Sequence, residues 1–198
     1  MENRESNFCA MMSRMKYIDR WALMRNSCTE NICEHSLEVA MIAHMLCVIG
    51  NKRFGKSLDA SKAALIGMYH DTTEIITGDM PTPVKYYNDT IQTVFHKIED
   101  AAAETLLDMI PEDLREEFYG LYFKQEEDAY LWKLVKAADK FSALIKCMEE
   151  KKAGNKEFDS AFKTTEASIK AMELPEADCF MEEFIPAYNK NLDELQKR

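Results

Sequence analysis

Apolar residues recur at helical spacing through almost the whole chain, and no stretch shows the apolar–polar alternation of a half-buried strand. One apolar stripe comprises Leu37, Ala40, Met41, Met45 and Val48. Gly50 follows this stripe, where it can cap the end of the helix. A second stripe, within residues 126–154, comprises Leu131, Leu134, Val135, Ala138, Ser142, Ile145 and Met148. The pattern predicts an all-α bundle without a heptad seam long enough for a coiled coil.

Little in the sequence interrupts these helices. The chain has 198 residues with only 6 Gly and 5 Pro, and it contains no linker, repeat or low-complexity tract. We therefore expect a single domain over residues 1–198. A net charge of -10 argues against a nucleic-acid polymer as partner, because binding to phosphate backbones needs a basic surface.

The beginning of the sequence, MENRESNFCAMMSRMKYIDRW, has no apolar core of signal-peptide length. The apolar stretches fall short of the ~20 residues of a membrane-spanning helix. We expect a cytoplasmic protein with no membrane partner.

Ionisable residues interrupt one apolar segment, KAALIGMYHDTTEIITG. The segment predicts a helix that begins after Asp59 and stops at Gly78. On such a helix, Glu74 would share a face with both His70 and Asp71, because positions three and four apart are neighbours. Three polar groups on one face of a core helix indicate a functional site.

Two further ionisable residues lie on predicted apolar stripes. Asp139 falls within the stripe of its own helix, and His35 begins another. A buried carboxylate needs a partner or a metal ion. The set His35, His70, Asp71 and Asp139 offers two imidazoles and two carboxylates, which suits a divalent Mn²⁺, Co²⁺, Fe²⁺ or Zn²⁺ ion.

Each of these groups has a simpler explanation when it is taken alone. His35 can be a helix-start histidine without a ligand role, His70 and Asp71 can be a satisfied core pair, and Asp139 can pair with a neighbouring lysine. The joint pattern on three predicted helices favours the shared metal ion.

Several motifs, in this order, resemble the HD-domain phosphohydrolases, which are named for an adjacent His-Asp pair. Within that group they resemble the bacterial 5'-deoxynucleotidases of the YfbR-like family. The motifs are RWALMRN (20–26), TENICEHSLEVAMIAH (29–44), MYHDTTEIITGDMPTPVKYY (68–87), KAADKFSALIKCMEE (136–150) and AGNKEF (153–158). The resemblance covers nearly the whole chain and implies an HD-domain helical bundle. It also implies a homodimeric phosphoric monoester hydrolase that converts deoxyribonucleoside 5'-monophosphates to deoxynucleoside and phosphate.

The same resemblance implies a role for each candidate residue. The metal ligands are His35, His70, Asp71 and Asp139. The catalytic residues are Glu74, as acid or base, and Arg20, which orients the phosphate. The substrate-binding residues are Arg20, Trp21, His35, Asp71, Asp79, Met80, Pro81, Thr82 and Asp139, with Trp21 in the nucleotide pocket and residues 79–82 at the sugar.

Elementary chemistry agrees with these roles. The guanidinium of Arg20 can form two parallel hydrogen bonds with a phosphate, which a lysine cannot do.

Two other functions stay open at this point. One is another HD-domain phosphohydrolase, acting on a deoxynucleoside triphosphate, an alarmone or a cyclic dinucleotide. The other is a non-enzymatic binding module that keeps the metal ion only for stability.

Overall fold

The computed structural model describes residues 5–85 and 87–197, and their regular structure is entirely helical. Within these ranges no strand forms, and the extended pairing is an isolated antiparallel bridge between Asp19 and Asn31. The predicted all-α fold class is confirmed.

The chain divides into two compact units, each built from three segments. The first unit comprises Met1–Met24, Thr29–Ser36 and Tyr69–Gln125, and the second comprises Arg25–Cys28, Leu37–Met68 and Glu126–Arg198. The single domain over residues 1–198 stays a prediction. The two units are described separately below.

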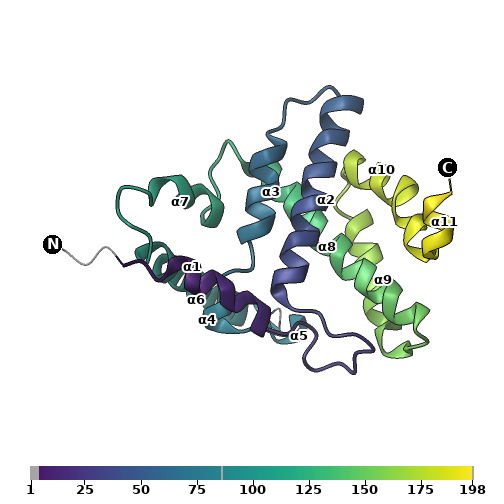
Figure 1. The fold of residues 1–198 in the computed structure, drawn as a ribbon, viewed down its shortest axis with the longest axis horizontal. Coiled ribbons are helices and arrows are strands. Elements are labelled where there is room, and N and C mark those ends of the chain that lie inside the picture. The colour runs from purple at the N-terminus through teal and green to yellow at the C-terminus, as the bar shows by residue number, and fades with distance from the viewer. Residues whose placement is uncertain (1–4, 86, 198) are drawn as a thin grey trace. The chain divides into compact units, whose positions relative to one another are not determined.

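The first unit surrounds a core of apolar and aromatic side chains. Its helices, seen in Figure 1, are α1 (Phe8–Met12), η1 (Ser13–Tyr17), α4 (Glu74–Thr77), α5 (Thr82–Lys85), α6 (Asp89–Asp108) and α7 (Glu116–Tyr122). Phe8 from α1 packs on Leu106, Leu107 and Ile110. The Phe8 ring also meets the Phe118 ring edge-on, with centroids 5.3 Å apart. Helices α1, α6 and α7 therefore share one core.

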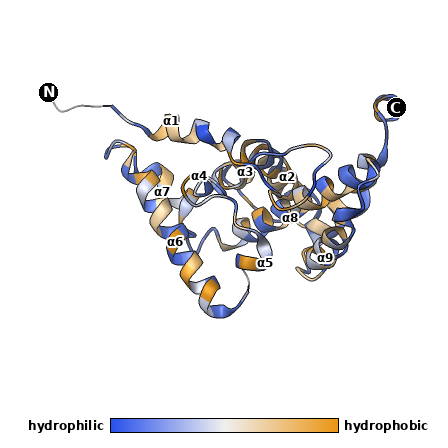
Figure 2. Cartoon of the chain, turned by 90° about the horizontal axis from the view of Figure 1, so that it is seen from below, coloured by the Kyte–Doolittle hydropathy of each residue, from blue (hydrophilic) through white to orange (hydrophobic). Residues whose placement is uncertain are grey.

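The amphipathic character of α6 follows from its sequence. The side chain of Asn88 caps the helix by accepting the N–H of Ile91 at 2.8 Å. The buried residues Phe95, Ala102, Ala103, Leu106 and Leu107 recur at helical spacing. In Figure 2, hydrophobic and hydrophilic residues alternate along the α6 ribbon.

The second unit contains most of the two longest helices. Its elements are α2 (Ile32–Arg53, which begins in the first unit), α3 (Ala60–Tyr69), α8 (Ala129–Lys152), η2 (Lys156–Phe158), α9 (Asp159–Lys170), α10 (Pro175–Glu183), η3 (Ile185–Asn189) and α11 (Leu192–Gln196). Helix α9 lies along α8 (Figure 1). Helices α2 and α3 approach closely at Gly67, where an added Cβ would lie 3.0 Å from the Ala40 Cα.

Two details of the predicted α2 stripe are wrong. Leu37 and Met41 are 56% and 63% exposed, whereas Val39 and Ile42 are buried. Helix α2 is apolar on almost every side, so periodicity alone cannot select the buried face. Gly50 does not end the helix either, because α2 continues to Arg53. Gly50 instead allows close packing, since a Cβ there would lie 2.7 Å from Glu176 Oε1.

Helix α2 does not fit the expectation that every apolar stretch is too short to span a membrane. By length and composition alone it is long and apolar enough to cross a membrane, with a mean hydropathy of 1.5 over its best window. Of that window, 56% is buried inside the protein. The core helix of a soluble protein meets the same criterion, so this finding is weak evidence for a membrane span.

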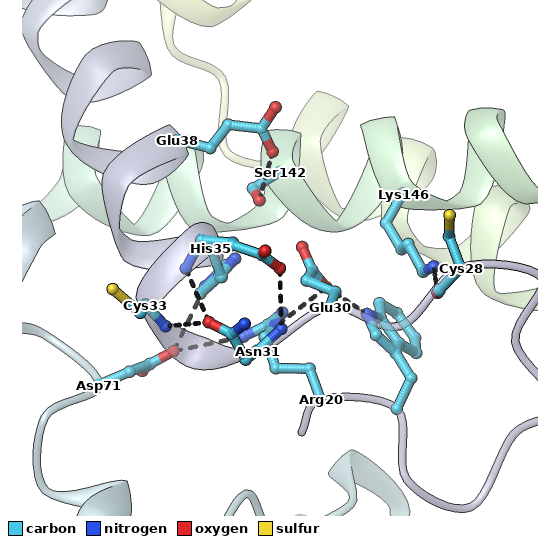
Figure 3. Close-up of polar contacts among 12 residues, drawn as sticks. Arg20, Cys28, Glu30, Asn31, Cys33, His35, Glu38, Asp71, Ser142 and Lys146 are labelled. Atoms are coloured by element: carbon cyan, nitrogen blue, oxygen red, sulfur yellow. Dashed lines mark hydrogen bonds and ion pairs between the residues drawn. The ribbon is translucent and has the colours of Figure 1, made fainter. Parts of the chain in front are cut away.

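A buried ion pair on α8 holds the loop segment 25–28 of the second unit. Lys146 Nζ lies 2.5 Å from Glu150 Oε1, and both side chains are almost fully buried. The Glu150 carboxylate accepts the Ser27 N–H at 2.9 Å and the Asn155 amide at 2.8 Å. Lys146 also donates to the Cys28 carbonyl at 2.5 Å, as Figure 3 shows.

Burial opposes ionisation of Glu150, but hydrogen bonds from Lys146, Asn155 and Ser27 lower its pKa to about 2.

We predict that Lys146→Met destabilises the protein by about 3–5 kcal/mol, because it leaves the Glu150 carboxylate buried without its cation. A matched control is Lys170→Met, which removes an exposed pair of the same i,i+4 spacing between Lys170 and Glu166. The control should cost at most about 1 kcal/mol. Urea denaturation at pH 7 measures both free energies of unfolding. Equal costs for the two variants would contradict the structural role of the Lys146–Glu150 pair.

Candidate active site

Three ionisable residues of the candidate site lie at a break between α3 and α4. His70 and Asp71 are within the break, and Glu74 follows it. Instead of the predicted continuous helix, α3 ends at Tyr69, residues 70–73 form turns, and α4 begins at Glu74. The Thr72 hydroxyl donates to the Tyr69 carbonyl at 2.7 Å, and the Thr72 N–H bonds to the same carbonyl at 3.1 Å. Local bonds of this kind compete with helical ones. The prediction that His70, Asp71 and Glu74 share a helix face is therefore wrong.

The turn nevertheless places His70 and Asp71 beside His35. His35 Nε2 lies 3.3 Å from Asp71 Oδ2, and His70 Nε2 lies 3.1 Å from the same oxygen. One ligand atom from each of the three residues lies within 4.8 Å of the others. His35 itself is only 1% exposed. Metal–ligand bonds of ~2.0–2.2 Å fit atoms at this separation, so the three side chains fit a divalent ion.

A local sequence signal explains the position of His35. The Asn31 side chain accepts the N–H groups of Cys33 and Glu34 at 3.0 and 3.1 Å, and Glu34 accepts the Asn31 N–H at 3.3 Å. This reciprocal cap fixes the beginning of α2. His35 consequently lies in the first turn of the helix, at a defined position.

Two acids of the candidate site, Asp71 and Glu74, differ in their ionisation. Burial opposes ionisation of Asp71, but His70 and His35 hold its pKa well below the ordinary range. Burial, together with repulsion from Asp71 and Asp79, raises the pKa of Glu74 to about 10. Glu74 is buried, and among the described residues its Oε2 has no hydrogen-bond partner. One carboxyl group is thus kept ionised and a nearby one protonated, as in acid–base sites.

Arg20 and Trp21 lie at the same centre, held by a residue that the sequence analysis missed. Arg20 Nη1 donates to Asp71 Oδ2 at 3.3 Å, and Arg20 Nε donates to Glu30 Oε2 at 3.2 Å (Figure 3). The Trp21 indole N–H donates to the same Glu30 oxygen at 3.0 Å. Nothing in the spacing of the sequence brings Glu30 to Arg20, because the chain between them is irregular.

The segment after α4 carries the predicted sugar-binding residues. Gly78 has a φ of 73°, which ends α4, and residues 79–81 are irregular before α5 begins at Thr82. Burial raises the pKa of Asp79. A hydrogen bond that Asp79 accepts from the Trp21 backbone opposes this shift without cancelling it. Asp79 thus adjoins the Arg20–Trp21 segment. Met80, Pro81 and Thr82 follow it directly.

Two other residues complete the account of the predicted site. Asp139 lies on α8 in the second unit and is partly buried, and its membership of the metal site stays a prediction. Lys85, which had no predicted role, lies 2.6 Å from Glu99 Oε1 and 4.7 Å above the Phe95 ring. Its charge is one of those that oppose the raised pKa of Glu74.

The chain is similar in sequence to proteins of one known family. The family model of the YfbR-like 5'-deoxynucleotidases matches residues 7–188. A 5'-deoxynucleotidase of Shewanella oneidensis is 45% identical over 192 residues, covering 97% of this chain and 98% of that protein. The 5'-deoxynucleotidase YfbR of Escherichia coli is 46% identical over 194 residues, covering 98% of each chain.

Solved structures show the fold. An HD-domain phosphohydrolase from Listeria innocua superposes with a TM-score of 0.80 at 20% identity, covering 92% of this chain and 88% of that one. The HD phosphohydrolase DatZ of cyanophage S-2L, solved with dA and one catalytic Zn²⁺ ion, superposes with a TM-score of 0.66 at 19% identity. That match covers 96% of this chain and 100% of DatZ. By sequence, the chain belongs to the YfbR-like 5'-deoxynucleotidase family, and it has the fold of the HD-domain phosphohydrolases.

Proposed function

We propose that the protein is a metal-dependent 5'-deoxynucleotidase that hydrolyses deoxyribonucleoside 5'-monophosphates to deoxynucleoside and phosphate. The observation that carries the proposal is the convergence of His35, His70 and Arg20 on Asp71 Oδ2, at 3.3, 3.1 and 3.3 Å. Relatives that are 45–46% identical over almost the whole chain have this activity in their names.

The proposed metal ligands are His35, His70, Asp71 and, from the second unit, Asp139. Mixed nitrogen and oxygen donors suit Mn²⁺, Co²⁺, Fe²⁺ or Zn²⁺, and the DatZ structure contains Zn²⁺. When bound, such an ion supplies Lewis-acid stabilisation of phosphoryl charge and acidifies water. That help matters because the uncatalysed hydrolysis of phosphate monoesters is among the slowest of biological reactions.

The chain's own residues divide the remaining work. Arg20 orients the phosphate through its guanidinium, with His35, Asp71 and Asp139 also in contact with the substrate. Glu74 holds a proton on its buried carboxyl and exchanges it with the attacking water or the leaving 5'-oxygen. Its raised pKa, about 10 without a bound metal ion, favours the protonated form.

The nucleoside end of the substrate is proposed to lie against Trp21 and the Asp79–Thr82 segment. Trp21 offers an aromatic face that stacks on any base. Asp79 accepts a hydrogen bond from the 3'-hydroxyl, and Met80, Pro81 and Thr82 form a wall beside C2'. Pro81 limits how far this wall can yield, because its ring fixes the backbone torsion φ.

The wider setting is also part of the proposal. We propose one HD domain that functions as a cytoplasmic homodimer, without a membrane or a nucleic-acid polymer as partner. The net charge of -10 supports the last point, because a negative surface repels phosphate backbones.

The metal site has a direct test in metal stoichiometry. His70→Ala and Asp139→Ala should each lower the bound metal, measured by elemental analysis after reconstitution with Mn²⁺ or Co²⁺ and desalting. Chelation should abolish phosphate release from the unmodified protein, and either ion should restore it. Full metal content in Asp139→Ala would remove Asp139 from the ligand set, and full content in His70→Ala would contradict the site itself.

The acid–base role predicts a different result for Glu74→Gln. This variant should keep its metal and bind nucleotide, while kcat falls by about 10²–10⁴-fold, the usual contribution of a positioned proton donor or acceptor. Metal content measured on the same sample is the control. Loss of the metal would make Glu74 a ligand instead.

The sugar contacts predict that deoxyribonucleoside 5'-monophosphates are hydrolysed, that ribonucleotides are poor substrates, and that 3'-monophosphates are not substrates. Asp79→Ala should lower kcat/KM for deoxynucleotides by about 10–100-fold, as expected when a charge-assisted hydrogen bond of ~1.5–3 kcal/mol is lost.

A 2',3'-dideoxynucleoside 5'-monophosphate is the matched control for Asp79, because it lacks the 3'-hydroxyl. The unmodified protein and Asp79→Ala should hydrolyse this analogue equally well. A loss of the same size on the dideoxy substrate would refute the proposed contact, and equal kcat/KM for ribo- and deoxyribonucleotides would refute the wall at C2'.

A further inference from the structure

Two consecutive side chains, Arg20 and Trp21, share a single acceptor atom. Glu30 Oε2 accepts Arg20 Nε at 3.2 Å and Trp21 Nε1 at 3.0 Å. The contact is largely shielded from water, since the side chains of Arg20 and Glu30 are 11% and 14% exposed. Shielding strengthens a charge-assisted hydrogen bond.

The backbone at Trp21 shows why this sharing is unusual. Neighbouring side chains in an extended chain point to opposite sides. Trp21 has a φ of 59°, a left-handed conformation that bulky residues rarely adopt. This conformation accompanies the approach of both side chains to one oxygen. Backbone strain of this kind persists only where surrounding contacts hold it, and it concentrates at functional sites.

The main chain of Glu30 holds the same segment. The Arg20 N–H donates to the Glu30 carbonyl at 2.9 Å, and the Ile32 N–H donates to the Ile18 carbonyl at 3.0 Å. These bonds flank the isolated bridge between Asp19 and Asn31. Asn31 is also the residue whose side chain caps α2. The Arg20–Trp21 segment is thus fixed relative to the helix turn that carries His35.

The negative charge of Glu30 allows two possible roles of this residue to be distinguished. A carboxylate beside Arg20 repels a phosphate dianion, so Coulomb's law alone predicts that neutralising Glu30 improves substrate binding. If Glu30 instead serves to aim Arg20, neutralising it must impair the reaction. The two explanations predict effects of opposite sign.

We propose that Glu30 is a positioning residue, which locks the Arg20 guanidinium toward the phosphate and the Trp21 indole toward the nucleoside in one geometry. The kinetic part of this proposal, the effect of Glu30 on catalysis, rests on the proposed nucleotidase function. Its geometric part, the fixed orientation of the Trp21 indole, does not. Without Glu30, the Arg20 guanidinium keeps its contact with Asp71 but loses the second bond that sets its plane.

The kinetic test uses Glu30→Ala and Glu30→Gln in the metal-reconstituted enzyme. Glu30→Ala should lower kcat/KM for a deoxynucleoside 5'-monophosphate by about 10–100-fold, the usual effect of removing a residue that orients a functional group. Glu30→Gln should fall between, because its amide oxygen can still accept both hydrogen bonds but lacks the charge that strengthens them. Glu104→Gln, which removes an exposed acid on α6, is the matched charge control and should leave kcat/KM unchanged.

A double-mutant cycle separates positioning from general damage. In an Arg20→Ala background, Glu30→Ala should lower kcat/KM by a smaller factor than in the unmodified enzyme, because only the Trp21 indole then remains for Glu30 to position. Full additivity, or a gain in kcat/KM on Glu30→Gln, would overturn the proposal.

A readout independent of activity follows from the tryptophan content. The chain has 2 Trp, so Trp132→Phe leaves Trp21 as the sole indole fluorophore. In that background Glu30→Ala should lower the steady-state anisotropy of Trp21, and Glu104→Gln should not. Unchanged anisotropy would refute the geometric part, even in a protein that hydrolysed no nucleotide. A lower anisotropy without any nucleotidase activity would leave the geometry standing and refute the proposed function.

Discussion

The polar centre of the first unit depends on one oxygen, Asp71 Oδ2. His35, His70 and Arg20 lie within 3.3 Å of it, and they come from three separate parts of the chain (Figure 3 labels His35, Asp71 and Arg20). The neighbouring imidazoles keep Asp71 ionised against the cost of burial. Each contact requires its own local device: the Asn31 cap for His35, the Thr72 turn for His70, and the Glu30 acceptor for Arg20.

Much of this centre was predictable from residue types. Helical periodicity predicted the all-α fold, and the coincidence of His35, His70 and Asp71 on apolar segments predicted their convergence. The geometry was less accessible. The threonine at position 72 was part of a predicted helix, yet its hydroxyl bonds back to Tyr69 and the helix breaks there. Pattern analysis counts apolar positions and does not weigh such local competition.

The remaining failures have a different origin, which is tertiary context. A helix that is apolar on most sides does not reveal its buried face, which is why Leu37 and Met41 were misplaced. Gly50 was interpreted as a cap, whereas packing against Glu176 explains it. Glu30 went unnoticed because an acid in an irregular segment has no periodic signal, although it contacts two predicted site residues.

The central proposal is that His35, His70 and Asp71 are ligands of one divalent ion, with Asp139 as the fourth. A crystal structure of the Mn²⁺-reconstituted protein, with diffraction data collected at wavelengths on both sides of the metal's absorption edge, tests it most directly. The account predicts one anomalous peak at about 2.0–2.3 Å from one atom of each of these residues, with Glu74 outside the coordination sphere. A peak elsewhere, or a peak that Glu74 coordinates in place of a histidine, would contradict it.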